Sequence, residues 1–219
     1  YGKLGSLASE GRTSATTVLA SSLLQHAERQ GSAQSKMLTF TDNRQDASLQ
    51  AGHFNDFAHV SLLRCALYSA LELEKELSYD KVAQAVVQAA KLNIRDIART
   101  PGIDPESQAA RDIRSVFSEL TEYRLYEDLR RGWRFVHPNL DQVGLLRVDY
   151  KGLQETSSDN KLWVGQPAFI GRTPAVRERI FRVLLNLFRR NLAIDAPCLE
   201  EIRQQQIRRR ADQWLNEYW

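Results

Sequence analysis

The stretch Lys36-Met-Leu-Thr-Phe-Thr-Asp-Asn-Arg-Gln-Asp-Ala-Ser48 decides how the rest of the chain is interpreted. Its first half, residues 37–41, is apolar and β-branched, which is typical of a short buried strand. Its second half, residues 42–46, is polar and leads into a long helix-forming run. Functional side chains often follow the carboxyl ends of strands in α/β proteins, so this turn is a candidate site. The alternative is an ordinary turn in which Asp42 or Asn43 caps the helix.

Outside this stretch the sequence predicts a mainly α-helical protein with a few short strands, an α+β fold. Apolar residues recur at helical spacing from Thr13, and again over residues 44–75, 106–131, 174–190 and 200–219. Further strands are predicted at residues 133–137 and 145–150, a polar loop at 151–161, and a flexible Gly- and Ser-rich lead-in at 1–11. A single strand at 37–41 cannot satisfy its own backbone. Its partners are therefore expected far along the chain or outside it.

Composition places the chain among soluble globular proteins. It has 219 residues, 42% of them hydrophobic and 26% charged, enough for one large domain or two small ones. No apolar run could span a bilayer and no signal peptide is present, so we expect a cytoplasmic protein without a membrane partner. The two cysteines, Cys65 and Cys198, are predicted to be buried free thiols, with a disulfide as the alternative. Four scattered histidines and no Cys-x-x-Cys pair predict no metal site.

Positive charge is concentrated at the carboxyl end of the chain. The formal net charge of +3 is too small to indicate a nucleic-acid binder by itself, but residues 172–219 contain ten Arg, six Asp or Glu and no Lys. Arginine favours planar, bidentate contacts to phosphate or carboxylate. One interpretation is a basic, DNA-facing surface; the other is a set of helices whose solvated face happens to be basic. The candidate surface residues are Arg177, Arg182, Arg189, Arg190, Arg208 and Arg209.

The chain contains none of the sequence motifs of a complete nucleotide-hydrolysing enzyme. It has no Gly-x-x-x-x-Gly-Lys-Ser/Thr phosphate loop, no acidic magnesium motif and no arginine-finger motif at the right spacing. Hydrolase patterns such as Gly-x-Ser-x-Gly and His-Glu-x-x-His are missing as well. We therefore predict no catalytic residue, and no cofactor bound by these residues alone.

The polar turn nevertheless resembles a known motor family. Phe40-Thr-Asp-Asn-Arg-Gln-Asp-Ala47, followed by Leu49-Gln-Ala-Gly-His-Phe-Asn-Asp-Phe57, is similar to motif IV and its following helix in large bacterial superfamily 2 helicases of the DEAD/DEAH-box type. These proteins pair two RecA-like domains with a C-terminal cysteine-cluster domain, and some act in anti-phage defence. Arg12–Leu19 resembles the helix that enters their second RecA-like domain. Residues 132–147 and the Arg-rich helix from Arg177 resemble their helical insertion.

The resemblance implies an internal fragment of an ATP-dependent DNA helicase or translocase. Residues 1–55 would begin the second RecA-like domain, 56–170 would be a helical insertion with a winged-helix-like segment near 106–150, and 171–219 would be basic C-terminal helices. ATP and Mg would be bound by the parent protein, whose remaining domains and DNA would be the partners. Two alternatives are a non-catalytic winged-helix DNA-binding module and a helical protein-interaction scaffold.

The resemblance also implies roles for the turn itself. Arg44 would contact a phosphate or the cleft between the motor domains, and Asp42, Asn43 and Gln45 would orient it.

Overall fold

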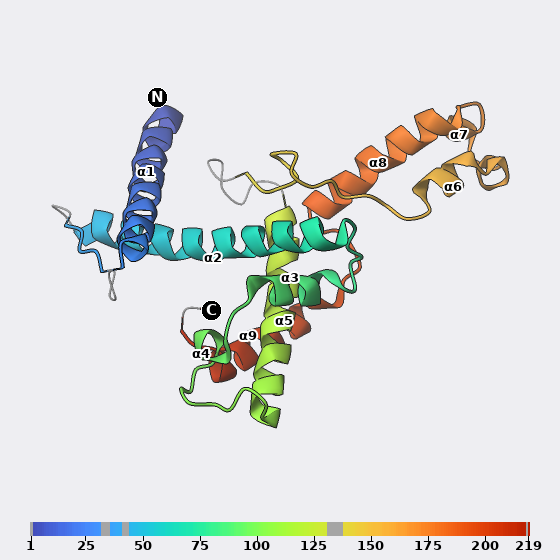
Figure 1. Ribbon diagram of the computed structural model, residues 1–219. Helices are drawn as coiled ribbons and strands as arrows, with labels where there is room; N and C mark the ends of the chain where they lie inside the picture. The colour runs from blue at the N-terminus through green and yellow to red at the C-terminus, as the bar shows by residue number, and fades with distance from the viewer. Residues whose placement is uncertain (1, 32–35, 41–43, 131–137, 218) are drawn as a thin grey trace.

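The structure, a computed structural model, describes residues 2–31, 36–40, 44–130, 138–217 and 219, and its regular elements are helical. In chain order these are α1 (Gly2–Arg29), α2 (Arg44–Glu74), α3 (Val82–Ala90), α4 (Ile94–Ile97), α5 (Gln108–Leu129), α6 (Leu153–Ser158), η1 (Asn160–Trp163), α7 (Pro167–Ile170), α8 (Pro174–Arg190), η2 (Pro197–Leu199) and α9 (Glu201–Trp214). The prediction of a mainly α-helical fold is confirmed. The long α2 runs across the molecule, with α1 rising from one end and the segment α6–α8 extending beyond the other (Figure 1).

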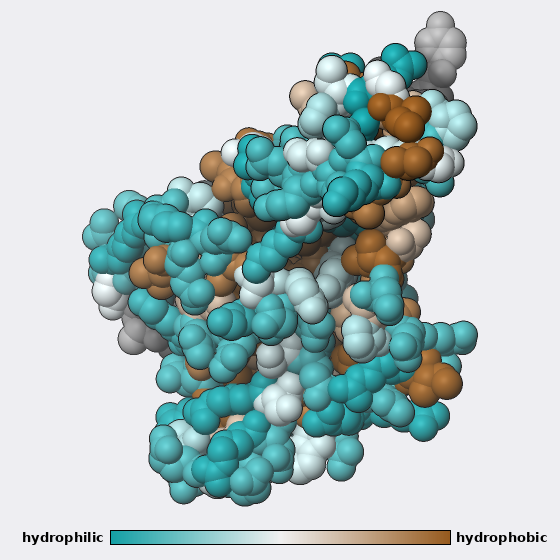
Figure 2. All heavy atoms as spheres, turned by 90° about the vertical axis from the view of Figure 1, so that its right-hand side faces the viewer, coloured by the Kyte–Doolittle hydropathy of each residue, from teal (hydrophilic) through white to brown (hydrophobic). Residues whose placement is uncertain are grey.

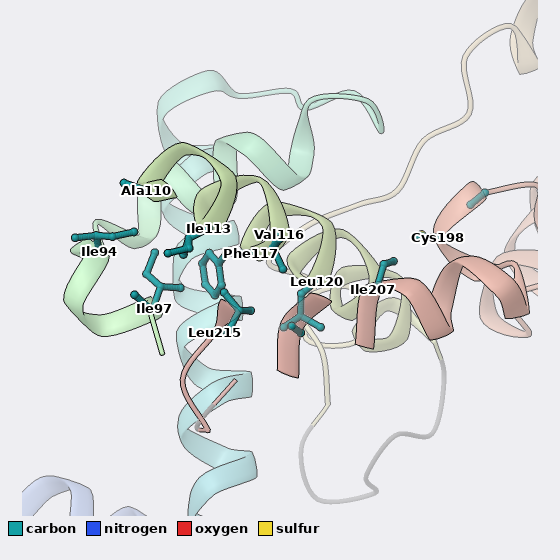
Figure 3. Packing of buried hydrophobic residues seen from close by; sticks show 13 residues of the cluster. Ile94, Ile97, Ala110, Ile113, Val116, Phe117, Leu120, Cys198, Ile207 and Leu215 are labelled. Carbon is teal, nitrogen blue, oxygen red and sulfur yellow. The ribbon is translucent and has the colours of Figure 1, made fainter. Parts of the chain in front are cut away.

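The main hydrophobic core lies where α4, α5, η2 and α9 meet. Ile113, Val116 and Phe117 on α5 are almost fully buried against Ile207 and Leu215, as Figure 3 shows. Fully burying a side chain of this size contributes about 1.5–3 kcal/mol. The helix begins where a cap allows, because the Ser107 hydroxyl accepts a hydrogen bond from the backbone N–H of Ala110 at 3.2 Å.

A second cluster joins α2 to this core. Ala66 and Leu67 of α2 pack with Val86 of α3, Leu125 of α5 and Leu140. Beside it, the Arg64 guanidinium donates to both oxygens of Asp128, with Nη2 to Oδ1 at 2.6 Å and Nε to Oδ2 at 3.1 Å. This ion pair is almost buried, and it fixes the middle of α2 to the last turn of α5.

The predicted strands are the main error of the sequence interpretation. Residues 36–40 form no strand, and Leu38 and Phe40 are 78% and 86% exposed. Residues 145–150 form none either, whereas residue 41 and residues 133–137 lie outside the described residues. β-Branched and aromatic residues favour a strand only where a neighbouring strand completes the backbone hydrogen bonds. Among the described residues, the single β-bridge is the isolated pair Ala98 and Leu215.

Other boundaries also differ from the predictions. Helix α1 already begins at Gly2, so the predicted flexible lead-in at 1–11 was wrong. The predicted loop at 151–161 contains α6 and the start of η1. In contrast, α8 begins at Pro174 as predicted, because Thr173 caps it and proline suits a first helical turn.

Candidate nucleic-acid interface

The predicted contact residue Arg44 is the first residue of α2. Its side chain and that of Gln45 are exposed, while Asp42 and Asn43 lie outside the described residues. The first turn of a helix carries a partial positive charge and unsatisfied N–H groups, so an arginine there adds to a local preference for anions. A phosphate group could therefore bind at this helix start.

Several large apolar side chains are exposed in the segments before and after Arg44 and on α1. Leu38 and Phe40 precede Arg44, Leu49 follows it on α2 and is 59% exposed, and Leu19 and Leu23 on α1 are 64% and 61% exposed. Isolated exposed leucines are ordinary, but this many large apolar residues in adjacent segments is typical of a surface that another protein segment covers.

The junction between α1 and α2 is held largely by polar groups. The buried imidazole of His53 lies 3.0 Å from the Thr17 hydroxyl through Nδ1 and 3.3 Å from the Ser14 hydroxyl through Nε2. Gln50 donates from Nε2 to the Thr17 hydroxyl at 3.1 Å. Because His53 is engaged with α1 on both ring nitrogens, its role here is structural.

Arg177, predicted to face DNA, is instead the centre of a small folding unit. Its side chain is 1% exposed, and its guanidinium donates to the carbonyl oxygens of Ser157, Phe169 and Ile170 at 2.9–3.1 Å. It also donates to Asn160 Oδ1 at 2.8 Å and lies 5.6 Å from the centre of the Trp163 ring. A buried guanidinium is stable only when its donors are satisfied, and here backbone carbonyls satisfy them.

Arg189, also predicted to face DNA, is buried at the opposite end of α8. Nη1 donates to the Leu129 carbonyl at 3.0 Å, and Nη2 lies 2.6 Å from Asp141 Oδ2. This arginine joins α8 to the end of α5. The prediction of a DNA-facing role was wrong for both Arg177 and Arg189, because internal contacts use their charge.

Of the remaining candidates on α8, Arg182 forms ion pairs with two carboxylates, and Arg190 makes one longer contact with a carboxylate. Arg182 lies 2.6 Å from Asp149 and 3.0 Å from Glu178. Its hydrogen bond is the main reason that the pKa of the Asp149 carboxyl is lowered. Arg190 is 3.8 Å from Asp141, a weaker contact.

Arg208 and Arg209 on α9 are both exposed. Their neighbours Arg203 and Arg210 are paired with Glu119 of α5 at 3.3 and 2.6 Å. The structure does not gather the predicted basic residues into one patch. These residues lie on three separate helices, α2 (Arg44), α8 and α9. The start of α2 and the helix α8 lie toward opposite ends of α2 (Figure 1).

A mainly apolar cavity of about 190 Å³ lies between α2, α3 and α5. Trp219 lines it, stacked on His59 with ring centres 5.2 Å apart and edge-on to Phe117 at 4.7 Å. Desolvation, reinforced by the charge of Arg124, lowers the pKa of His59. Asp56 and Glu127 also line this cavity, so its polar groups do not favour an anionic ligand.

Within the described ranges, no three His, Cys, Asp or Glu side chains are grouped so that they could hold a metal ion. None of the helices found in those ranges is both long enough and apolar enough to cross a membrane. Comparisons of the chain with protein-family models, curated proteins and solved structures found no match.

Two features were not predicted from the sequence. One is the Arg64–Asp128 ion pair, whose partners are separated by 64 positions. The other is an exposed apolar stripe on α8. The helical spacing of that stripe was visible in the sequence, but the face on which α8 would pack was not.

Proposed function

We propose that the chain is a segment of an ATP-dependent superfamily 2 DNA helicase or translocase, in which it contacts the nucleic-acid backbone and couples the motor domains. Residues 1–55 would belong to a RecA-like domain. The catalytic residues, the ATP and the Mg would all belong to the parent protein.

The observation that carries this proposal is the exposed side chain of Arg44 at the start of α2. Arg44 belongs to the segment that resembles the helicase motif, and exposed apolar side chains precede and follow it in the sequence. An inter-domain cleft needs that combination: an apolar surface for the neighbouring domain and a cation for the phosphate. The winged-helix alternative lacks comparable support, because residues 145–150 form no wing strand.

The test measures binding of fluorescent single-stranded DNA at low salt by anisotropy, for the unsubstituted chain and for the Arg44→Ala variant. The loss of one phosphate contact should weaken binding. It should also reduce the steepness of the plot of log association constant against log salt concentration by about one unit. Arg95→Ala is the matched control, because Arg95 is an exposed arginine on the short helix α4.

Three results would count against the proposal. Equal binding by the Arg44→Ala variant would remove the contact role of the turn, and no binding at low salt would remove the nucleic-acid role altogether. ATP hydrolysis by the chain alone would show that catalysis does not belong to other domains.

A further inference from the structure

Helix α8 carries a continuous exposed apolar stripe, which we call the α8 ridge. Its residues share one helical face at spacings of three and four, and they are 36–64% exposed: Val176, Ile180, Val183, Leu184, Leu187 and Phe188. At 1.5 Å per residue the ridge extends about 18 Å along the helix. On the side of the molecule shown in Figure 2, hydrophobic residues reach the surface in the upper half, at the height of α1 and α8.

The chain cannot bury this ridge by turning the helix. Along the edge of the ridge farthest from Val183, α8 is fixed by Arg177 and by Phe181, whose ring lies 5.1 Å from that of Trp163 and 5.2 Å from that of Phe169. Arg189 fixes the last turn through the Leu129 carbonyl and Asp141. The ridge is therefore held outward by the same contacts that fold the helix.

The charge beside the ridge is positive. Successive helical residues are turned by about 100°, which puts Arg179 and Arg190 on the same Val183 edge of the ridge, about 16 Å apart along the helix axis. Arg179 is exposed, and Arg190 has only its 3.8 Å contact with Asp141. The one acidic residue of the helix, Glu178, is paired with Arg182.

We propose that the α8 ridge is a docking surface for an amphipathic helix whose apolar face is flanked by Asp or Glu. An apolar stripe of about 100° is the width that one helix buries against another, and acidic flanks would meet Arg179 and Arg190. This interface is separate from the phosphate contact proposed at Arg44 and does not depend on it.

Three other occupants fit less well. A second copy docked symmetrically would oppose arginine to arginine, and like charges across an interface disfavour association. A nucleic acid would leave six apolar side chains against phosphates. An anionic membrane surface usually requires a broader cationic face than the two arginines that remain after Arg177, Arg182 and Arg189 are used internally.

The test uses two synthetic helical peptides with identical leucine positions, one flanked by Glu and the other by Lys, titrated against the whole chain by anisotropy. The Glu peptide should bind at least tenfold more tightly than the Lys peptide. Val183→Glu and Leu187→Glu should each weaken binding of the Glu peptide by at least tenfold, and Arg179→Glu should reduce its advantage over the Lys peptide. Ile202→Glu, at a 73% exposed site on α9, is the matched control and should change nothing.

Circular dichroism of each variant establishes that it is folded, as expected for substitutions at exposed positions. The proposal is overturned if the two peptides bind equally or if neither binds. It is also overturned if the Val183→Glu and Leu187→Glu variants bind the Glu peptide as tightly as the unsubstituted chain does. It is also overturned if sedimentation shows that the chain is a dimer and that Val183→Glu dissociates this dimer. Binding of the chain to anionic vesicles that Val183→Glu abolishes would overturn it as well.

Discussion

Removal of Arg64 should destabilise the fold more than removal of any exposed arginine. The guanidinium makes a bidentate contact with Asp128 and a 3.0 Å hydrogen bond from Nη1 to the Pro138 carbonyl, and the two side chains are 14% and 7% exposed. Arg64→Met leaves the Asp128 carboxylate in a poorly hydrated site without its counter-ion. Breaking a buried pair in this way costs about 3–5 kcal/mol.

The assay is urea unfolding followed by circular dichroism, with the free energy of unfolding extrapolated to water. Arg182→Ala is the control, because its pair with Asp149 is exposed and such pairs contribute about 0–1 kcal/mol. The double variant Arg64→Met/Asp128→Leu should recover part of the loss, since it leaves no buried charge alone. The reasoning is refuted if Arg64→Met costs no more than Arg182→Ala, or if the double variant costs the sum of the single ones.

Two further predictions follow from titratable groups. The lowered pKa of His59 means that the unfolded chain takes up a proton near pH 6.5 before the folded chain does, so the free energy of unfolding should fall as the pH drops below that value. His59→Phe keeps an aromatic ring against Trp219 and should flatten this dependence in urea titrations; an unchanged pH profile would contradict it. Burial raises the pKa of the Cys198 thiol to about 11, whereas Cys65 is exposed, so the prediction that both thiols are buried was wrong for Cys65. Iodoacetamide at neutral pH should therefore modify Cys65 much faster than Cys198, as followed by peptide mass spectrometry, and equal rates would be evidence against the buried site.

The sequence predicted the helices well because their signals are local. The Pro174 start of α8 depends on residues within one turn, and so does the start of α5, two residues from its predicted position at 106. The strand at 37–41 was predicted from composition alone, and composition does not supply the second strand that a ladder requires. The described part of that segment, residues 37–40, is instead exposed and has no regular secondary structure.

The contacts of the arginines on α8 could not be predicted either, because they depend on residues distant in the sequence. Arg177, Arg182, Arg189 and Arg190 have similar sequence surroundings, but one is enclosed by carbonyl groups, two have carboxylate partners within 2.6 Å, and one has only a distant contact. These differences depend on Ser157, Asp149 and Asp141, which are 20–48 positions away. A count of basic residues therefore overstated the surface available to DNA.

The position of the Arg64–Asp128 pair gives the proposed coupling a physical route. Arg44 and Arg64 lie on one uninterrupted helix, 20 residues apart, which is about 30 Å of a stiff element. A displacement of the first turn of α2 would be transmitted along the helix, and the ion pair with Asp128 joins α2 to α5. The polar contacts of His53 would carry α1 along with it. In a motor, Arg64→Met should therefore uncouple DNA-stimulated ATP hydrolysis from strand movement while the phosphate contact at Arg44 is retained. If the Arg64→Met variant is folded by circular dichroism and still loses both together, the coupling lies elsewhere than in α2.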